Sequence, residues 1–525
     1  MLEPRCRPGL ACGIVYVPVY AALLAALPLL ALALAVFRTE LSLGTAAWIV
    51  TAGASALAVA AFGLSPAGLL AGAAKGAWTG VWILLLVVPA LLLFQVADST
   101  GGLDRLSDAL GDVAPTPGRR LLLIGWAFPS FLQGAAGFGV PVVVAAPMLV
   151  RTGMAPAAAV AACLVGYHWS VTFGSMGSSF FVAVGTANLP ADEAGRFAVQ
   201  AAILLAVGAA ATAAVLLRQA RGLRRDGPRA AGVAVVMGTT LVGVAAVQPA
   251  LGSTAAGLAG LLAAWLLFPR AGERPQARPL LLASSPYLLL TGLVVAVFGV
   301  PQVRELAEQV PALAPSFPET IAAFGHVNAA VAAHQPLRPL LHPGPYLLVA
   351  AAVGALVYRR LGWWPQDRWT RAFVAPWARR SRSTIISLLG LTTLAGVMVD
   401  AGMLAAMAQA LTAALGLAFV PLAVIVGAGG TVLTGSTTAS NALLAPLQAD
   451  AAAQLGLAPT TLLVAQTVGG NIGNALTPIN AVIAAAAVGA SGAEGEILRR
   501  ALKTMLPVAA VAVVGVVALA LLDAV

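Results

Sequence analysis

Charged residues are scarce in this 525-residue chain. Only 9% of its residues are Asp, Glu, Lys or Arg, whereas soluble domains carry about 25%, so the chain cannot cover a soluble surface. Its three cysteines, Cys6, Cys12 and Cys163, are too few and too scattered for a disulfide framework or a metal cluster. Neither of its two lysines, Lys75 and Lys503, follows a glycine. The sequence therefore has no Walker A motif, and ATP-driven transport would need a separate subunit.

Apolar residues dominate instead. They make up 60% of the chain, its mean hydropathy is +0.94, and apolar runs recur at about the 20 residues that cross a bilayer core. We predict an all-α, multi-pass protein of the inner (plasma) membrane with about 12 transmembrane helices and two re-entrant hairpins. The first run ends at Arg38 without a cleavage site, which favours a helix over a signal peptide. The predicted spans are residues 14–37, 45–63, 76–96, 157–185, 197–217, 231–248, 254–268, 281–300, 345–358, 384–399, 460–487 and 505–522.

The net charge of +10 lies in short loops between apolar runs, which indicates cytoplasmic loops rather than nucleic-acid binding. Residues 218–229 carry five Arg against one acid, residues 359–382 carry seven, and residues 270–278 are also basic. The long loop 301–344 has no basic excess and should lie outside. Its three histidines, His326, His334 and His342, lack acidic or Cys partners at ligand spacing. We therefore expect solvated loop histidines and no metal site.

Two apolar stretches are interrupted and do not fit a simple span. Residues 121–150 contain four breaking residues, and basic residues flank both ends, so both ends should be cytoplasmic. This pattern predicts a re-entrant hairpin. Residues 421–447 have a small polar centre at 434–441 and no basic residue nearby, which predicts a second hairpin that enters from the opposite face. The breaking residues of the first hairpin are Gly134, Gly137, Gly139 and Pro141.

The two hairpins belong to an internal repeat. An offset of 303 residues places the four residues from Gly153 on those from Gly456, and Gly166 on Gly469. Seven predicted spans separate the hairpins, and an odd number inverts the second copy. Asp98 and Asp400 end their spans at similar places, where we expect an interfacial capping role. The predicted organisation is 1–75 for the N-terminal helices, 76–217 for the first repeat, 218–383 for connecting helices and loops, and 384–525 for the second repeat.

Polar breaks at membrane depth predict the binding site. Irregular backbone in a bilayer is tolerated where it lines a cavity or packs in protein, and each repeat supplies a hairpin tip and a broken span. Ser, Thr, Asn and Gln side chains, together with N–H groups at helix N-termini, suit a carboxylate with a hydroxyl. Small residues also serve tight helix packing, which is the usual reading of an isolated Gly or Thr. The predicted substrate-binding residues are Gln133, Gly134, Gly137, Phe138, Gly139, Thr172, Ser175, Ser178, Gly435, Ser436, Thr437, Thr438, Ser440, Asn441, Asn471, Asn474 and Thr477.

His168 is the one ionisable side chain inside the broken spans. Its titration near neutral pH suits a proton relay, so it is the candidate for proton coupling. The alternative is a buried neutral imidazole bonded to a backbone carbonyl. The glycines of residues 134–139 lack the GxGxxG order of a dinucleotide site.

Three stretches closely resemble signatures of the bacterial L-lactate permease family: FLQGAAGFGVP at 131–141, FGSMG at 173–177 and TGSTTASNAL at 434–443. The resemblance covers the chain from about Gly76 onward and continues at 454–457, 469–470 and 477–478. It implies a fold with paired hairpins and uptake of lactate or glycolate with protons. The family pattern usually has Glu where this chain has Gln133, Asp where it has Thr437, and small polar residues where it has Tyr167 and His168. These differences leave two questions open: whether the chain couples transport to protons through His168, and whether it prefers another anion as its substrate.

We expect a secondary transporter of a small monocarboxylate such as L-lactate or glycolate, driven by proton symport with alternating access. It would need no cofactor beyond the coupling ion, H⁺ or Na⁺. The expected partners are a small organic anion and the lipid bilayer, with no nucleic acid, and a homodimer is a further expectation. The alternative within the class is a sodium-coupled carrier of a dicarboxylate or other organic anion. A membrane enzyme or assembly factor would need paired acids or a His–metal site at membrane depth, and the sequence shows neither.

Overall fold

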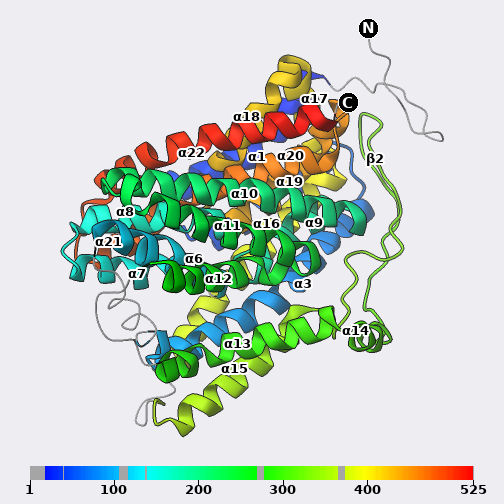
Figure 1. The fold of residues 1–525 in the computed structure, drawn as a ribbon. Helices are drawn as coiled ribbons and strands as arrows, with labels where there is room; N and C mark the ends of the chain where they lie inside the picture. The colour runs from blue at the N-terminus through cyan, green and yellow to red at the C-terminus, as the bar shows by residue number, and fades with distance from the viewer. Residues whose placement is uncertain are drawn as a thin grey trace.

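The computed structural model describes residues 18–38, 41–103, 105, 116–135, 137, 139–268, 277–364 and 373–523, and these residues are nearly all helical (Figure 1). The α-helices are α1 (Val19–Arg38), α2 (Leu43–Ala60), α3 (Pro66–Ser99), α5 (Pro117–Arg120), α6 (Phe128–Ala135), α7 (Val140–Arg151), α8 (Pro156–Gly166), α9 (Ser178–Thr186), α10 (Ala191–Gln219), α11 (Leu223–Val247), α12 (Gly252–Leu267), α13 (Ala277–Gly299), α14 (Pro301–Glu308), α15 (Pro343–Arg360), α16 (Ala375–Asp400), α17 (Met403–Leu415), α18 (Phe419–Thr434), α19 (Thr437–Gln454), α20 (Pro459–Asn474), α21 (Pro478–Ala487) and α22 (Glu494–Asp523). A π-helix, η1 (Leu121–Ala127), joins α5 to α6, and short 3-10 turns are η2 (His168–Ser170), η3 (Ser175–Gly177), η4 (Pro249–Leu251) and η6 (Gly416–Ala418).

The helices confirm an all-α, multi-pass membrane protein. Within the described residues, nine helices are long and apolar enough to cross a membrane, or ten if the bent pair around α8 and α9 is one span. The predicted spans 14–37, 345–358 and 460–487 are not among the nine, whereas α17 and α18 together count as one (Met403–Thr434). The predicted number of twelve therefore stays a prediction.

Both predicted hairpins are pairs of helices joined by a short turn. In the first, α5, η1 and α6 form one arm that packs against α7; in the second, α18 packs against α19. Glycines with positive φ make the turns, at +79° for Gly139 before α7 and +74° for Gly435 after α18. Glycine adopts this left-handed conformation without the steric cost that a side chain would add. That the hairpins are re-entrant stays a prediction.

The helix boundaries keep the offset of the predicted repeat, whose inverted orientation stays a prediction. Helices α8 and α20 begin at Pro156 and Pro459, and α7 and α19 end at Arg151 and Gln454, so both pairs keep the offset of 303. Gly166 and Gly469 also make equivalent contacts. A side-chain carbon at Gly166 would overlap the Gly125 carbonyl oxygen, and one at Gly469 would overlap that of Val424. Each glycine thus seats its broken span on the first arm of its own hairpin.

The two broken spans run in opposite directions. The last part of the second span, α21, packs against α7 and α8, where the first span begins, and α19 packs against α9, where the first span ends. Figure 1 places α7, α8 and α21 together at one end of the bundle, and the loop that contains β2 lies at the other end. This arrangement brings the middles of both spans together.

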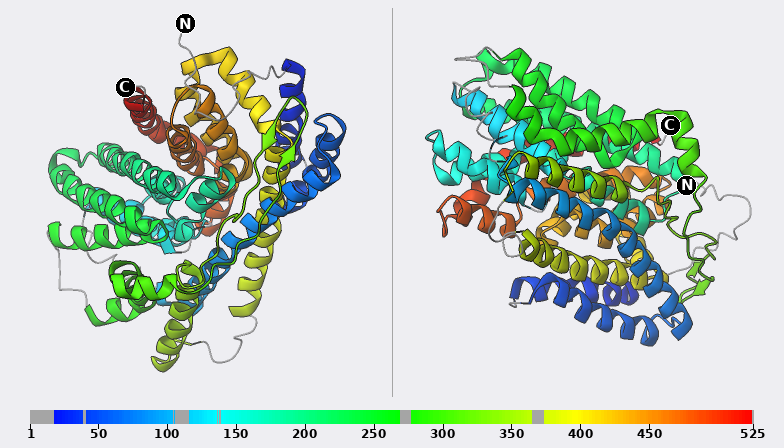
Figure 2. Two further views of the ribbon diagram at one scale, coloured as in Figure 1. Left: turned by 90° about the vertical axis from the view of Figure 1, so that its right-hand side faces the viewer. Right: turned by 90° about the horizontal axis from the view of Figure 1, so that it is seen from below.

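Long helices precede each hairpin, and glycines let them pack closely. A side-chain carbon at Gly76 of α3 would overlap the Thr392 carbonyl oxygen of α16, and one at Gly396 would overlap that of Gly72. Small residues at such spacing allow helix backbones in membranes to touch. Helices α3 and α16 therefore form a tightly packed pair beside the repeats (Figure 2).

The long loop 301–344 is a structured ribbon along one end of the bundle, as both Figure 1 and Figure 2 show. Strands β1 (Thr320–Ile321) and β2 (Val327–Asn328) pair antiparallel within it. The prediction of solvated histidines is wrong for His334 and His342, which are each 4% exposed because the ribbon packs on α3. The Nε2 atom of His334 lies 3.1 Å from Thr79 Oγ1. The described residues contain no group of three or more His, Cys, Asp or Glu side chains that could hold a metal ion.

A buried ion pair joins the two long helices beneath this ribbon. Lys75 Nζ of α3 lies 2.9 Å from Asp400 Oδ2, at the end of α16. Thr320 Oγ1 of the ribbon donates to the same carboxylate oxygen at 3.2 Å. The predicted capping role of Asp400 is wrong, because its carboxylate binds an ammonium and a hydroxyl instead of helix N–H groups.

Candidate functional site

A small cavity of about 50 Å³ lies where the hairpin tips and broken spans meet. The sequence predicted four polar breaks that face one another, and the structure brings residues from all four to this cavity. At roughly 10–15 Å³ for one water, the cavity holds only a few non-hydrogen atoms. Its lining consists of Gln133, Gly139, Val171, Ser175, Ser178, Gly435, Ser436, Thr437, Thr438, Asn474 and Asn480.

Four helices begin at the cavity. Gly139 precedes α7, Ser178 begins α9, Thr437 begins α19, and Asn480 lies in the first turn of α21. The first N–H groups of a helix have no partner within it, and its N-terminus carries a partial positive charge. The convergence of four such ends makes the cavity suitable for an anion.

No charged side chain lines the cavity among the described residues. An anion there would be held by helix ends and neutral donors, which suits reversible binding better than a fixed ion pair. The cavity also offers an acceptor, because Asn474 Oδ1 is buried and has no partner in the described part of the chain. Donors together with one acceptor match a carboxylate that carries a hydroxyl.

Backbone conformation forms the first break. Ser175 and Met176 have φ values of +46° and +57°, and Gly177 follows at +75°. Left-handed backbone is unfavourable for residues with side chains and persists where the surroundings enforce it, often at functional sites. The hairpin tip contacts this turn, since a side-chain carbon at Gly137 would overlap Ser175 Oγ.

Side chains organise the second break. Ser436 caps α19, with its Oγ accepting from the Ala439 N–H at 3.5 Å, and Thr437 Oγ1 donates to the Gly470 carbonyl at 3.0 Å. Thr437 therefore ties the tip of the second hairpin to its own broken span.

A buried network connects the two repeats beside the cavity. Thr172 Oγ1 donates to Asn471 Oδ1 at 2.8 Å and lies 2.9 Å from Thr467 Oγ1. Asn441 Nδ2 donates to the Ser179 carbonyl at 3.1 Å. These residues fix the positions of the two spans relative to each other.

The structure divides the predicted substrate-binding residues into two groups. Nine line the cavity, and the seven others that the structure describes pack around it. Gly134 contacts the backbone of Thr254 in α12, Ser440 Oγ donates to the Gly427 carbonyl at 3.3 Å, and Thr477 Oγ1 donates to the Asn474 carbonyl at 3.0 Å. Gly137, Thr172, Asn441 and Asn471 make the contacts given above, and Phe138 lies outside the described residues.

Val171 and Asn480 line the cavity although they were not predicted to bind substrate. Asn480 had a usable signal, because Pro478 marks a helix start and places the asparagine in the first turn. Val171 had none, since its apolar side chain resembles those of the surrounding span.

His168 lies away from the cavity lining. Its Nδ1 is 2.8 Å from the Val165 carbonyl oxygen and 3.5 Å from Thr212 Oγ1 of α10. A ring nitrogen this close to a carbonyl acts as a hydrogen-bond donor. The imidazole is 2% exposed, and it faces α10 rather than the hairpin tips.

Two larger pockets approach the centre from opposite ends. One of about 550 Å³ shares Gly435, Ser436 and Thr438 with the cavity and extends to Ser383 near the start of α16. The other, of about 920 Å³, lies under the ribbon and includes Lys75. Its lining shares no residue with the cavity among those described.

Known proteins resemble the whole chain. A profile of the L-lactate permease family matches residues 21–523. The L-lactate permease of Escherichia coli strain K12 is 28% identical over 527 residues, covering 92% of each chain. The glycolate permease GlcA of the same strain is 27% identical and covers 85% of this chain and 84% of that protein. Among solved structures, the Alcanivorax borkumensis YdaH transporter has a TM-score of 0.46 at 17% identity, covering 96% of this chain and 98% of that one.

Proposed function

The chain belongs to the L-lactate permease family, and on this premise we propose that it carries a small monocarboxylate, such as L-lactate or glycolate, by proton symport with alternating access. It is a multi-pass transporter of the bacterial plasma membrane and not an enzyme. Relatives named as L-lactate and glycolate permeases support both substrates.

The convergence of four helix N-termini on an uncharged polar cavity carries the proposal. Helix ends stabilise a carboxylate without a fixed cation, and the unpaired Asn474 oxygen can accept from a 2-hydroxyl group. The small volume favours a two- or three-carbon acid over a larger anion.

Alternating access is supported by the opposed broken spans and the two pockets. The pocket that reaches the cavity extends toward the start of α16, which follows the basic segment predicted to be cytoplasmic. We propose that this conformation faces inward. Movement of the hairpins and broken spans against α3 and α16 would then connect the cavity to the pocket under the ribbon, as expected for inverted repeats.

Proton symport needs a group that can take up and release a proton. Gln133 and Thr437 line the cavity without a titratable proton. A relay through His168 would run along the interface of α8 and α10. His168→Gln keeps a hydrogen-bond donor but cannot change charge between about pH 5 and 8. If His168 couples, the variant loses proton-driven accumulation but still exchanges substrate down its gradient; full accumulation would eliminate His168 and leave the substrate itself as the proton carrier.

A sodium-coupled carrier is the second candidate. The observation that favours it is the concentration of hydroxyl, amide and carbonyl oxygens in the second break, including the unpaired Asn474 oxygen. Broken helices in transporters coordinate Na⁺ with such oxygens.

Uptake into proteoliposomes tests both candidates. Labelled L-lactate, glycolate and succinate would be supplied under a proton gradient or a sodium gradient, each imposed separately. We expect accumulation of the two monocarboxylates with the proton gradient alone. Accumulation of succinate with sodium alone would replace this proposal with the second candidate. The homodimer stays a prediction, which light scattering of the purified protein would test.

A further inference from the structure

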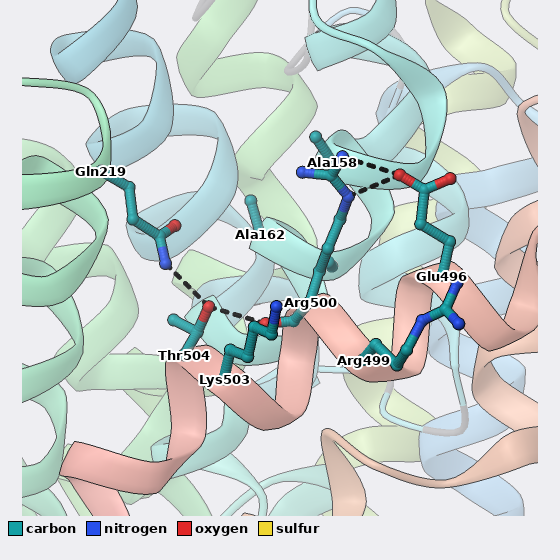
Figure 3. Close-up of a pocket in the computed structure, with 9 residues that line it drawn as sticks. Ala158, Ala162, Gln219, Glu496, Arg499, Arg500, Lys503 and Thr504 are labelled. Carbon is teal, nitrogen blue, oxygen red and sulfur yellow. Dashed lines mark hydrogen bonds and ion pairs between the residues drawn. The ribbon is translucent and has the colours of Figure 1, made fainter.

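A separate pocket, of about 460 Å³, lies among α8, α10 and α22, away from the transport cavity (Figure 3). One wall is the start of α22, with Arg499, Arg500 and Lys503, and the opposite wall is formed by alanines of α8. Gln219 of α10 closes the pocket, where its Nε2 donates to Thr504 Oγ1 at 2.9 Å. Three helices thus build a defined cationic recess.

The recess has an excess of positive charge. Arg500 is neutralised by Glu496, whose Oε1 lies 2.7 Å from the guanidinium, as the dashed lines in Figure 3 show. Arg499 and Lys503 have no carboxylate partner in the part of the chain that the structure describes. Two unneutralised cations therefore border the same pocket.

The predicted topology places the pocket at the cytoplasmic membrane surface. Gln219 ends α10 directly before the arginine-rich segment predicted to be cytoplasmic. The inner leaflet of a bilayer carries the anionic lipids that basic pockets between helices recognise. Its phosphate groups would lie at the level of this recess.

An apolar surface continues from the cations toward the bilayer centre. On α22, Arg499, Lys503 and Leu506 follow one face at helical spacing, and Leu506 is 59% exposed. Leu502 beside it is 46% exposed. A headgroup site that continues into an exposed leucine stripe matches the two parts of a phospholipid.

We propose that this pocket binds an anionic phospholipid of the cytoplasmic leaflet, with its phosphate at Arg499 and Lys503 and an acyl chain along Leu502 and Leu506. Helix α22 packs against α8 of the first repeat and α20 of the second. The bound lipid would hold α22 to α8, the helix that leads into the first break, and so stabilise the contact between the repeats.

Native mass spectrometry of the full-length protein tests the proposal. After exchange into a mixture of phosphatidylethanolamine and phosphatidylglycerol, the protein should retain bound phosphatidylglycerol, the anionic lipid of the two. Arg499→Gln with Lys503→Gln should weaken retention roughly 30-fold, because each cation near an anionic surface contributes about 1 kcal/mol, a factor of about five. The matched control is Arg304→Gln with Arg338→Gln, which removes the same charge from the outer ribbon and should change nothing.

Further variants and a competition experiment distinguish lipid binding from the binding of a free anion and from misfolding. The charge-conserving variant Arg499→Lys with Lys503→Arg should retain the lipid, whereas Leu506→Ser should weaken it while leaving the cations intact. Equal retention by the Gln variant and its control would overturn the site. Displacement of the lipid by inorganic phosphate at comparable concentration, with no effect of Leu506→Ser, would overturn the lipid and assign a phosphate site. Neither readout depends on the transported substrate.

Discussion

The two repeats share one backbone plan but are stabilised differently. In the first, the break spans residues 167–177 and uses left-handed backbone at Ser175 and Met176. In the second, α20 and α21 are separated only by residues 475–477, and side-chain bonds such as that of Thr437 to Gly470 connect tip and span. The two breaks therefore lie at corresponding places in the predicted repeats, and different interactions stabilise each of them.

The largest expected effect concerns the ion pair that links α3 and α16, the long helices before the two hairpins. Asp400→Asn should destabilise the protein by about 3–5 kcal/mol, because Lys75 would keep a buried charge without a partner. Lys75→Met with Asp400→Leu should recover much of this loss. Thermal unfolding in detergent measures both.

The control is Arg304→Gln in the exposed pair Arg304–Glu308, where we expect at most about 1 kcal/mol. If Asp400→Asn were as mild as this control, the long helices would not depend on their ion pair and the repeats would be linked in another way.

The next effect tests the equivalence of the repeats directly. Gly166→Ala and Gly469→Ala should each cost about 1–3 kcal/mol or more, since the new methyl group would overlap a backbone carbonyl of the hairpin arm. Gly195→Ala and Gly429→Ala are matched controls, because no atom lies within 4 Å of the place where their new methyl group would be. Fluorescence-detected size exclusion would report the yield of folded protein. A large effect in one repeat but not in the other would break the comparison.

A smaller effect distinguishes the cavity from its supports. Ser436→Gly keeps the helix cap nearly intact but removes a hydroxyl from the cavity. Loss of a hydrogen bond to a charged group is worth roughly 1.5–3 kcal/mol, so the apparent affinity for substrate should fall about tenfold or more. Asn441→Ala should instead lower thermal stability, because Ser179 and Thr467 lose their partner. Transport affinity and unfolding temperature would be measured on both variants. If Ser436→Gly lowered the unfolding temperature and Asn441→Ala lowered the affinity, the assignment of Ser436 to the cavity and of Asn441 to its support would be wrong.

The smallest effect concerns the ribbon, which has no counterpart in the second repeat. Burial lowers the pKa of His342 from 6.5 to about 4. Between these values the unfolded state binds the proton and the folded state does not, so stability falls as pH decreases from 6.5 toward 4. His342→Asn retains a good helix cap for α15 and should reduce this loss. The unfolding temperature of each protein would be measured at pH 7.5 and at pH 5. If His342 did not contribute, the decrease between the two pH values would be the same in the variant as in the original protein.

The sequence by itself determined the parts whose signals are local. Apolar runs predicted the helices, the glycine-rich and small polar breaks marked the hairpin tips, and the match of Gly166 to Gly469 gave an offset that the helix boundaries keep. It also placed four polar breaks at membrane depth. These features follow from short-range backbone preferences and from the cost of unsatisfied polar groups in lipid.

Only the tertiary structure decided which residues of each break reach the cavity and which connect the repeats. Ser178 lines the cavity, whereas the adjacent Ser179 accepts from Asn441, because neighbouring residues at the start of a helix point in different directions. The pairing of Lys75 with Asp400, and the burial of His334 by the ribbon, likewise depend on how distant segments pack. Contacts between residues hundreds of positions apart arise from helix packing, and no local pattern in the sequence specifies them.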